Sequence, residues 1–259
     1  MSLTASLKGK LALITGCTGG IGSATARLLA QYGCSIAVHH SSEATKAKAD
    51  ELVAELTKHE GVKAAAFQAN LLTFEETKKL YDEVVQKLGN PDILFGNAGA
   101  PFTQIGPTGN IRDISPQEFE NTWRLNVGAD YYLSHLCVPH MEQQKWGRVV
   151  FTSSVGALTG GVVGPHYASS KAAIHGLVRW LSLRYAKDGI CTNAIAPWLI
   201  EDTGIVRNAT LPPDIASQIP VGRLGRPEEV ASVVLMLVQN GFMTNKVITI
   251  DGGWTNGGL

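Results

Sequence analysis

The stretch Thr15-Gly16-Cys17-Thr18-Gly19-Gly20-Ile21-Gly22 decides the fold of this chain. It follows a short apolar run typical of a buried strand, and apolar residues recur after it at helical spacing. Gly16, Gly20 and Gly22 stand where the strand turns into the helix, and residues without a Cβ let the backbone come close to a pyrophosphate. The free N–H groups and positive dipole at the start of that helix favour the same anion. Glycines placed between a strand and a helix therefore predict a dinucleotide-binding turn.

Short apolar runs alternate with amphipathic stretches from this turn to the far end of the chain. Such alternation predicts an α/β fold: a single-domain, doubly wound, Rossmann-like parallel sheet of about seven strands with helices on both faces. The predicted strands are residues 11–15, 35–39, 62–67, 92–95, 147–152, 190–195 and 247–250. The predicted helices are residues 21–32, 43–59, 74–88, 115–144, 166–187 and 227–239. We expect one domain over residues 1–259, in which a long irregular region near 198–225 forms a lid over the substrate.

Composition limits the partners of the chain. Its 259 residues are 44% apolar and 17% charged, and 22 basic residues balance 22 acidic ones. Zero net charge without a basic stripe argues against nucleic acid and anionic membranes as partners. No apolar run reaches the roughly 18 residues of a membrane span. The four cysteines are widely spaced, which predicts reduced thiols, and the seven histidines show no metal-ligand spacing. We therefore expect a cytoplasmic protein without a metal.

The glycine spacing G-x-x-x-G-x-G resembles that of the short-chain dehydrogenase/reductase family, and the resemblance extends over roughly residues 8–254. Asn97-Ala98-Gly99 resembles the family's N-N-A-G element, with Gly96 in place of the first asparagine. Residues 223–231 resemble the stretch before its last helix, and residues 251–253 its C-terminal ending. The chain is similar to 3-oxoacyl-acyl-carrier-protein reductases in particular. The resemblance implies an NAD(P)-dependent oxidoreductase that moves a hydride between a nicotinamide and a carbonyl or alcohol carbon.

The end of the second strand indicates which coenzyme is used. An acid there would accept hydrogen bonds from the ribose 2′-OH and repel a 2′-phosphate. Alignment with the family puts His40 at this position, followed by Ser41 and Ser42, whose hydroxyls could donate to a phosphate that Lys46 could also reach. Because no acid comes before Glu43, we predict NADP(H), with NAD(H) as the alternative. The other coenzyme contacts that the resemblance implies are Gly16, Thr18, Gly20, Ile21, Gly22, Asn70, Leu71, Asn97, Ala98, Gly99, Tyr167, Lys171, Pro197, Trp198 and Ile200.

Tyr167 and Lys171 form Y-x-x-x-K on a predicted helix, which places both side chains on one face about one turn apart. The resemblance implies that they are catalytic together with Ser154 and Asn126. Hydride delivery builds negative charge on the carbonyl oxygen, so a proton donor must lie beside it. A nearby ammonium favours phenolate, so we expect Lys171 to lower the pKa of Tyr167 from its usual value of about 10. Ser154 would hydrogen-bond the substrate oxygen, Lys171 would also hold the nicotinamide ribose, and Asn126 would hold a water that relays protons.

Three functions remain open at this stage. The first is reduction of a ketone to a secondary alcohol, on a 3-oxoacyl or small carbonyl substrate. The second is an alcohol or sugar dehydrogenase running in the oxidative direction. The third is a catalytically silent NADP-binding sensor, which would not need Tyr167 and Lys171. Trp198 follows Pro197 where the family commonly has glycine, so its indole could cover the nicotinamide or narrow the pocket.

The expected partner is a small-molecule carbonyl or alcohol, with an acyl-carrier protein as an open alternative. Acyl-carrier proteins are acidic, so docking should favour basic residues near the mouth of the site. Lys145 fits a position where such enzymes are basic, whereas Asp188 occupies another that is usually basic. The resemblance also implies a homotetramer, or a homodimer, assembled through the long helix and the Tyr167 helix.

Overall fold

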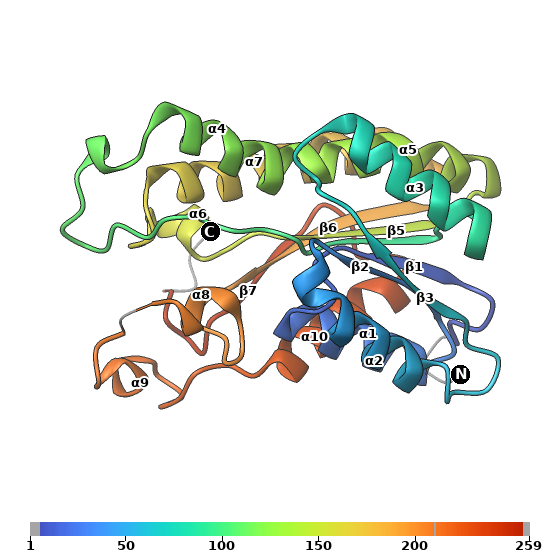
Figure 1. Cartoon of the computed structure of the whole chain (residues 1–259), viewed down its shortest axis with the longest axis horizontal. Coiled ribbons are helices and arrows are strands. Elements are labelled where there is room, and N and C mark those ends of the chain that lie inside the picture. The colour runs from blue at the N-terminus through green and yellow to red at the C-terminus, as the bar shows by residue number, and fades with distance from the viewer. Residues whose placement is uncertain (1–5, 210, 256–259) are drawn as a thin grey trace.

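The sheet holds seven parallel strands in the order β3-β2-β1-β4-β5-β6-β7 (Figure 1). The structure, a computed structural model, describes residues 6–209 and 211–255, so the ends of the predicted domain and residue 210 of the predicted lid lie outside the described residues. The strands are β1 Leu11–Ile14, β2 Ser35–His40, β3 Ala64–Gln68, β4 Ile93–Gly96, β5 Gly147–Thr152, β6 Ile190–Pro197 and β7 Val247–Ile250. The predicted doubly wound fold is confirmed. The strand order reverses between β1 and β4, which is where ligands bind in open sheets of this kind.

Helices cover both faces of the sheet (Figure 1). One face carries α1 Gly20–Gln31, α2 Lys46–Leu56 and α10 Pro227–Gln239. The other carries α3 Phe74–Leu88, α4 Pro116–Trp123, α5 Ala129–Gln144 and α7 Pro165–Tyr185. The short helices are α6 Gly156–Thr159, α8 Gly204–Arg207 and α9 Ile215–Gln218. Among the described residues, no helix is both long and apolar enough to cross a membrane.

Two apolar layers hold these elements together, one on each face of the sheet. Successive side chains of a strand point to opposite faces of the sheet. Ile14 therefore packs under α1 and α10, while Leu13 packs under α5 and α7. The side chains of β1, β4 and most of β5 are buried, as expected for parallel strands covered on both sides. The carboxyl ends of these strands therefore emerge between two helical layers, and the loops that follow them converge there.

Three sequence predictions differ from the structure in detail. The predicted helix 43–59 begins as a single 3-10 turn at Glu43–Thr45 and continues as α2. The predicted helix 115–144 is divided by a π-helical turn at Arg124–Gly128, a local widening that often occurs at functional sites. The predicted irregular region 198–225 contains α8 and α9, and Ile200 forms a bridge with Gly225 that closes the segment on itself.

Candidate active site

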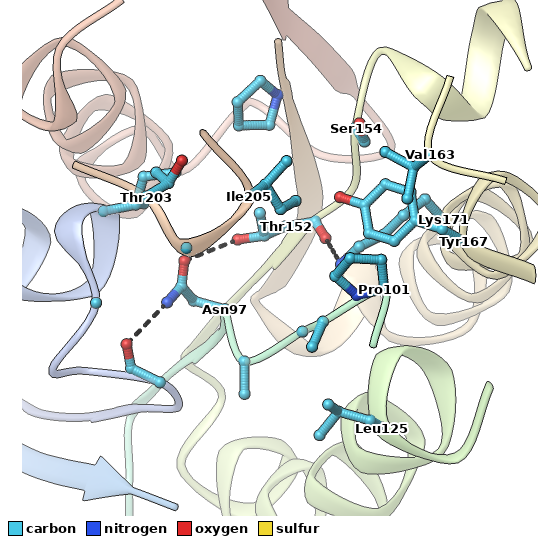
Figure 2. A pocket seen from close by; sticks show the side chains of 18 of the residues that line it. Asn97, Pro101, Leu125, Thr152, Ser154, Val163, Tyr167, Lys171, Thr203 and Ile205 are labelled. Carbon is cyan, nitrogen blue, oxygen red and sulfur yellow. Dashed lines mark hydrogen bonds between the residues drawn. The ribbon is translucent and has the colours of Figure 1, made fainter. Parts of the chain in front are cut away.

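A cavity of about 760 Å³ opens at the carboxyl ends of the strands. Its walls come from the loops after β1, β2, β3, β4, β5 and β6, and from the start of α7. Figure 2 shows Ser154, Tyr167 and Lys171 on one wall, Asn97 on another, and Thr203 and Ile205 of the segment after β6 facing them. The cavity thus joins the glycine turn to the Y-x-x-x-K helix.

The glycine positions of the turn leave no room for a side chain. Gly16 has a φ of 59°, a left-handed conformation that favours glycine. A Cβ on Gly22 would lie 2.4 Å from the carbonyl oxygen of Gly16, and one on Gly20 would lie 2.7 Å from that of Asp202. The α1 helix begins with no side-chain cap at Gly19, which leaves its first N–H groups directed outward. The turn can therefore hold a pyrophosphate against backbone N–H groups.

Asn97 fixes this turn to the end of β4. Its side-chain amide donates to the carbonyl oxygens of Thr15 (3.0 Å) and Gly16 (3.2 Å). The backbone N–H groups of Asn97 and Ala98 both donate to the Thr15 hydroxyl at 2.9 Å. On the other side, the Thr152 hydroxyl donates to the Asn97 amide oxygen at 3.4 Å (Figure 2). Polar side chains at the ends of three strands thus lock the coenzyme turn to the catalytic wall.

The end of β2 presents its two histidines differently. His39 borders the cavity, accepting from the N–H of Gly16 at 3.0 Å and donating through Nε2 to the oxygen of Ala69 at 3.1 Å. His40 is buried, and its Nδ1 lies 3.0 Å from the oxygen of Ser42. Ser41 also borders the cavity. His40 and Ser42 are outside its lining, and Lys46 is paired with Asp50 one turn along α2.

Tyr167 and Ser154 come from different elements and lie together on the catalytic wall. Tyr167 is on the first turn of α7, and Ser154 follows β5. Both side chains flank Gly156, where an added Cβ would be 3.4 Å from Ser154 Oγ and 3.8 Å from Tyr167 Cε1. The Ser154 hydroxyl accepts from the N–H of Gly156 at 3.0 Å, which holds it in place. A carbonyl oxygen entering here would meet a serine hydroxyl and a phenol together.

Lys171 and Asn126 lie behind Tyr167. The Lys171 ammonium donates to the oxygen of Thr152 at 2.6 Å (Figure 2). The Asn126 amide oxygen accepts from the N–H of Ala100 at 3.0 Å, and its nitrogen donates to Ser170 on α7. An added Cβ on Gly99 would be 3.0 Å from both the Asn126 oxygen and Lys171 Nζ, so these two groups approach one point of the cavity lining. Asn126 itself is fully buried outside that lining.

Burial is the main influence on the pKa values of Tyr167 and Lys171. It raises the pKa of Tyr167 to about 12, while a hydrogen bond from Ser154 opposes the rise. Burial also lowers the pKa of Lys171 to about 8, and the nearby Asp130 carboxyl opposes that change. The expectation that Lys171 lowers the pKa of Tyr167 is therefore wrong for this structure. The reason is that the phenol lies in a low-dielectric site and the ammonium is directed at Thr152, 5.8 Å from the centre of the ring.

The end of the cavity beyond Tyr167 is uncharged and largely apolar. Trp198 lines it and stacks on Trp254, with ring centres 3.9 Å apart and ring planes 18° from parallel. The residues around this end carry no ionised side chain in the described part of the chain: Pro101, Phe102, Gln104, Leu125, Thr159, Val162, Val163, Trp198, Leu199, Ile205 and Asn208. An uncharged organic group suits this end, because a buried charge without a partner is costly.

Most of the site residues predicted from the sequence meet in this cavity. Its lining includes Ser154, Tyr167, Lys171, Gly16, Thr18, Gly20, Ile21, Ser41, Asn70, Leu71, Asn97, Ala98, Gly99, Pro197, Trp198 and Ile200. Gly22 lies just behind the turn, and His40, Ser42 and Asn126 are also outside the lining. Sequence reasoning missed His39, Thr15 and Thr152. Their signal was a polar residue at the end of an apolar strand, directly before a predicted loop.

Lys145 lies away from the mouth of the site. It precedes β5, at the amino end of that strand, whereas the cavity is at the carboxyl ends. Its ammonium donates to the Asp188 carboxylate at 2.7 Å, so each charge is largely neutralised by the other. Within one copy of the chain, this pair does not offer a basic surface beside the cavity.

Comparison with known proteins gives consistent matches over nearly the whole chain. Residues 10–213 match the family model described as short chain dehydrogenase. The chain is 34% identical to a 3-oxoacyl-acyl-carrier-protein reductase of Aquifex aeolicus, over 95% of this chain and 98% of that protein. It is also 34% identical to a cyclohexanol dehydrogenase of an Acinetobacter species, over 95% of each. A solved 7α-hydroxysteroid dehydrogenase complexed with NADH and 7-oxo glycochenodeoxycholic acid superposes with a TM-score of 0.86 at 30% identity, covering 98% of this chain and 97% of that one.

Proposed function

This chain belongs to the short-chain dehydrogenase family of oxidoreductases, and from that premise we propose that it uses NADP(H) to reduce an uncharged ketone to a secondary alcohol. The observation that carries the proposal is a cavity with the glycine turn at one end and the Ser154–Tyr167–Lys171 wall at the other. The first end suits a dinucleotide and the second suits proton transfer to an oxygen.

The residues of the site divide the work of the reaction. When bound, the nicotinamide coenzyme supplies the hydride. Gly16 to Gly22 and the start of α1 would hold the pyrophosphate of this coenzyme, and Lys171 would hold its nicotinamide ribose. Ser154 donates a hydrogen bond to the substrate carbonyl oxygen, which orients it toward Tyr167. Tyr167 then gives its phenolic proton to that oxygen as negative charge develops there.

The acidity of Tyr167 suits reduction at neutral pH. With its pKa raised to about 12 by burial, the phenol keeps its proton at neutral pH and is ready to act as an acid. An alcohol dehydrogenase would need the phenolate as a base, which becomes abundant only at higher pH. The oxidative alternative is thus favoured in alkaline solution. The intact pair of Tyr167 and Lys171 argues against a silent sensor, which has no use for a proton donor.

The coenzyme preference follows from the end of β2. No carboxylate borders the cavity in the described part of the chain, so nothing there repels a 2′-phosphate. Ser41 offers a hydroxyl donor at this position. Lys46 is paired with Asp50, and the described residues that border this end of the cavity include no other cation, so we expect a modest preference for NADPH rather than an absolute one.

The substrate preference follows from the opposite end of the cavity. Its uncharged, largely apolar lining and the Trp198–Trp254 stack suit an alicyclic or aromatic ketone better than a carboxylate or a phosphate. A 3-oxoacyl group on an acyl-carrier protein is the second candidate, favoured by the similarity to the Aquifex reductase. The Lys145–Asp188 pair gives that candidate little electrostatic support.

Three further features complete the proposal. We propose that residues 198–225 act as a lid, since Leu199, Thr203 and Ile205 line the cavity. A homotetramer or homodimer is supported by large exposed apolar side chains on α4, α5 and α7: Phe119, Tyr131, Trp180 and Leu183. The four free, buried cysteines suit a reducing compartment such as the cytoplasm.

The test is coenzyme consumption over a panel of ketones at neutral pH. The panel holds cyclic ketones, an aryl ketone, a 2-oxo acid and an acetoacetyl thioester that mimics an acyl-carrier substrate, each with NADPH and with NADH. We expect turnover of the cyclic or aryl ketones with NADPH and little with the 2-oxo acid. Turnover of the thioester alone would support the second candidate, and no turnover with any compound would reject the reductase proposal.

A further inference from the structure

Gly96 leaves room for a buried acid. It stands where the family's N-N-A-G element begins with asparagine, and a Cβ at this position would lie 2.2 Å from Oδ1 of Asp130 and 2.7 Å from a ring carbon of Phe151. Asp130 is only 3% exposed. The Asp130 carboxyl therefore occupies the space that any side chain at position 96 would need.

This carboxyl lies behind the catalytic wall. Asp130 is the second residue of α5 and follows Asn126 by four positions, so both side chains are on the same side of the helical segment. Gly96 pairs with Phe151 in the sheet, and the next residue, Thr152, accepts the hydrogen bond of the Lys171 ammonium. Asp130 and Lys171 thus approach the same end of β4 and β5 from two neighbouring helices.

The pKa values of Asp130 and Lys171 depend on each other. Burial raises the pKa of Asp130 well above its usual value, and attraction to Lys171 lowers it. Burial lowers the pKa of Lys171, and attraction to Asp130 raises it. An isolated buried ammonium tends to lose its proton and an isolated buried carboxylate tends to gain one, whereas each charge beside the other makes both charged forms tolerable.

The other ionisable groups near α5 do not replace Asp130 as the partner of Lys171. On α3, Tyr81 keeps its proton because burial raises its pKa to about 12, and Cys137 on α5 itself has its pKa raised by burial. β4 carries no ionisable residue, and Arg148 of β5 donates to Val238 of α10 on the other face of the sheet. On α7, burial lowers the pKa of His175, which favours its neutral form.

We propose that Asp130 is a positioning residue whose carboxylate is the counter-ion of Lys171, and that Gly96 exists to admit it. This pairing keeps Lys171 charged at neutral pH, where Tyr167 donates its proton to the substrate oxygen. The inference rests on the proposed function, because its main readout is the pH dependence of ketone reduction. It adds to the family's four residues an acid that this chain places behind them.

The test is the pH profile of kcat/KM for reduction in Asp130→Asn, which keeps the size of the side chain and removes its charge. Without the carboxylate, the Lys171 ammonium loses its proton at a lower pH, so the alkaline limb of the profile should move to lower pH by about one unit or more. Activity on the acid side of the limb should stay within about threefold of the unchanged protein, because the ammonium is intact there. Ser134→Ala is the matched control, since Ser134 is buried one turn along α5 and its hydroxyl donates to the backbone oxygen of Asp130.

An alkaline limb that stays in place in active Asp130→Asn would overturn the proposal. Asp130→Ala is made in parallel, so that failure of one variant to fold leaves the same comparison open.

Thermal unfolding of Gly96→Ala and of the Gly96→Ala, Asp130→Ala double variant tests the geometry without any measurement of activity. The double variant should be the more stable of the two, because removal of the carboxyl relieves the clash; equal or lower stability contradicts the placement of Asp130. If no ketone is reduced, the proposed function fails, and this second comparison still decides whether Gly96 admits Asp130.

Discussion

His39 connects the stability of the fold to its coenzyme turn. The ring accepts the N–H of Gly16 through Nδ1 and donates to Ala69 through Nε2, an arrangement that only the neutral ring can make. Burial, aided by the charge of His40 and opposed by the bond to Ala69, lowers its pKa to about 4 from the usual 6.5. Protonation would place a second hydrogen between Nδ1 and the Gly16 N–H, and the turn would lose its support.

The size of the effect follows from the two pKa values. Below pH 6.5 the unfolded chain takes up a proton that the folded chain refuses until about pH 4. Stability from this group is therefore complete above pH 6.5 and is lost as the pH falls toward 4. At 1.36 kcal/mol for each pKa unit, the loss amounts to about 3 kcal/mol. That is a large part of the free energy of unfolding of a typical domain.

The assay is urea unfolding at a series of pH values from 7.5 to 4.5 in three proteins. Between these limits the unchanged protein should lose roughly 2 to 3 kcal/mol more than His39→Gln, because glutamine does not titrate. His59→Gln is the matched control, since His59 lies in the turn after α2, away from the cavity. Contributions of the other ionisable groups are common to all three proteins and cancel. Equal losses in the unchanged protein and in His39→Gln would refute the reasoning.

Three other substitutions have defined outcomes. Tyr167→Phe should reduce kcat by roughly 100-fold or more, because it removes the proton donor, while fluorescence titration shows unchanged coenzyme affinity; near-normal turnover would reject the assignment. Gly22→Ala should weaken coenzyme binding at least tenfold in the same titration, since its Cβ would lie 2.4 Å from a backbone oxygen, whereas Gly176→Ala, with open space around it, should bind normally. Ser41→Asp should reverse the preference to NADH in steady-state kinetics, because a carboxylate there repels the 2′-phosphate, and a retained preference for NADPH would show that Ser41 does not face the ribose.

The overall fold was predictable because its signals are local. A glycine cluster between a strand and a helix, followed by regular strand–helix alternation, leaves few topologies for a chain of this length. The strand β7 and the helix α10 begin and end where the sequence predicted. The helices α8 and α9 were not predicted, because each has four residues, too few to show a helical repeat. The π-helical turn that carries Asn126 depends on tertiary packing and leaves no pattern in the sequence.

The sequence predicted the site residues whose placement follows from their spacing. It did not predict the features of the site that depend on burial. Tyr167 and Lys171 share a helix face by their spacing, and the structure places both in the cavity. His39, rather than His40, borders that cavity because neighbouring side chains on a strand point to opposite sides, and the sequence does not show which side is open. The raised pKa of Tyr167 and the contact of Asp130 with Gly96 both depend on packing between distant segments.

Transfer of deuterium tests the central claim most directly. The protein is incubated with a cyclic ketone and NADPH that carries deuterium on the transferable position of the nicotinamide, and the alcohol product is analysed by mass spectrometry. Direct hydride transfer predicts one deuterium on the carbinol carbon of every product molecule. An alcohol without that label, or a ketone recovered unchanged while the coenzyme remains bound, would contradict the account.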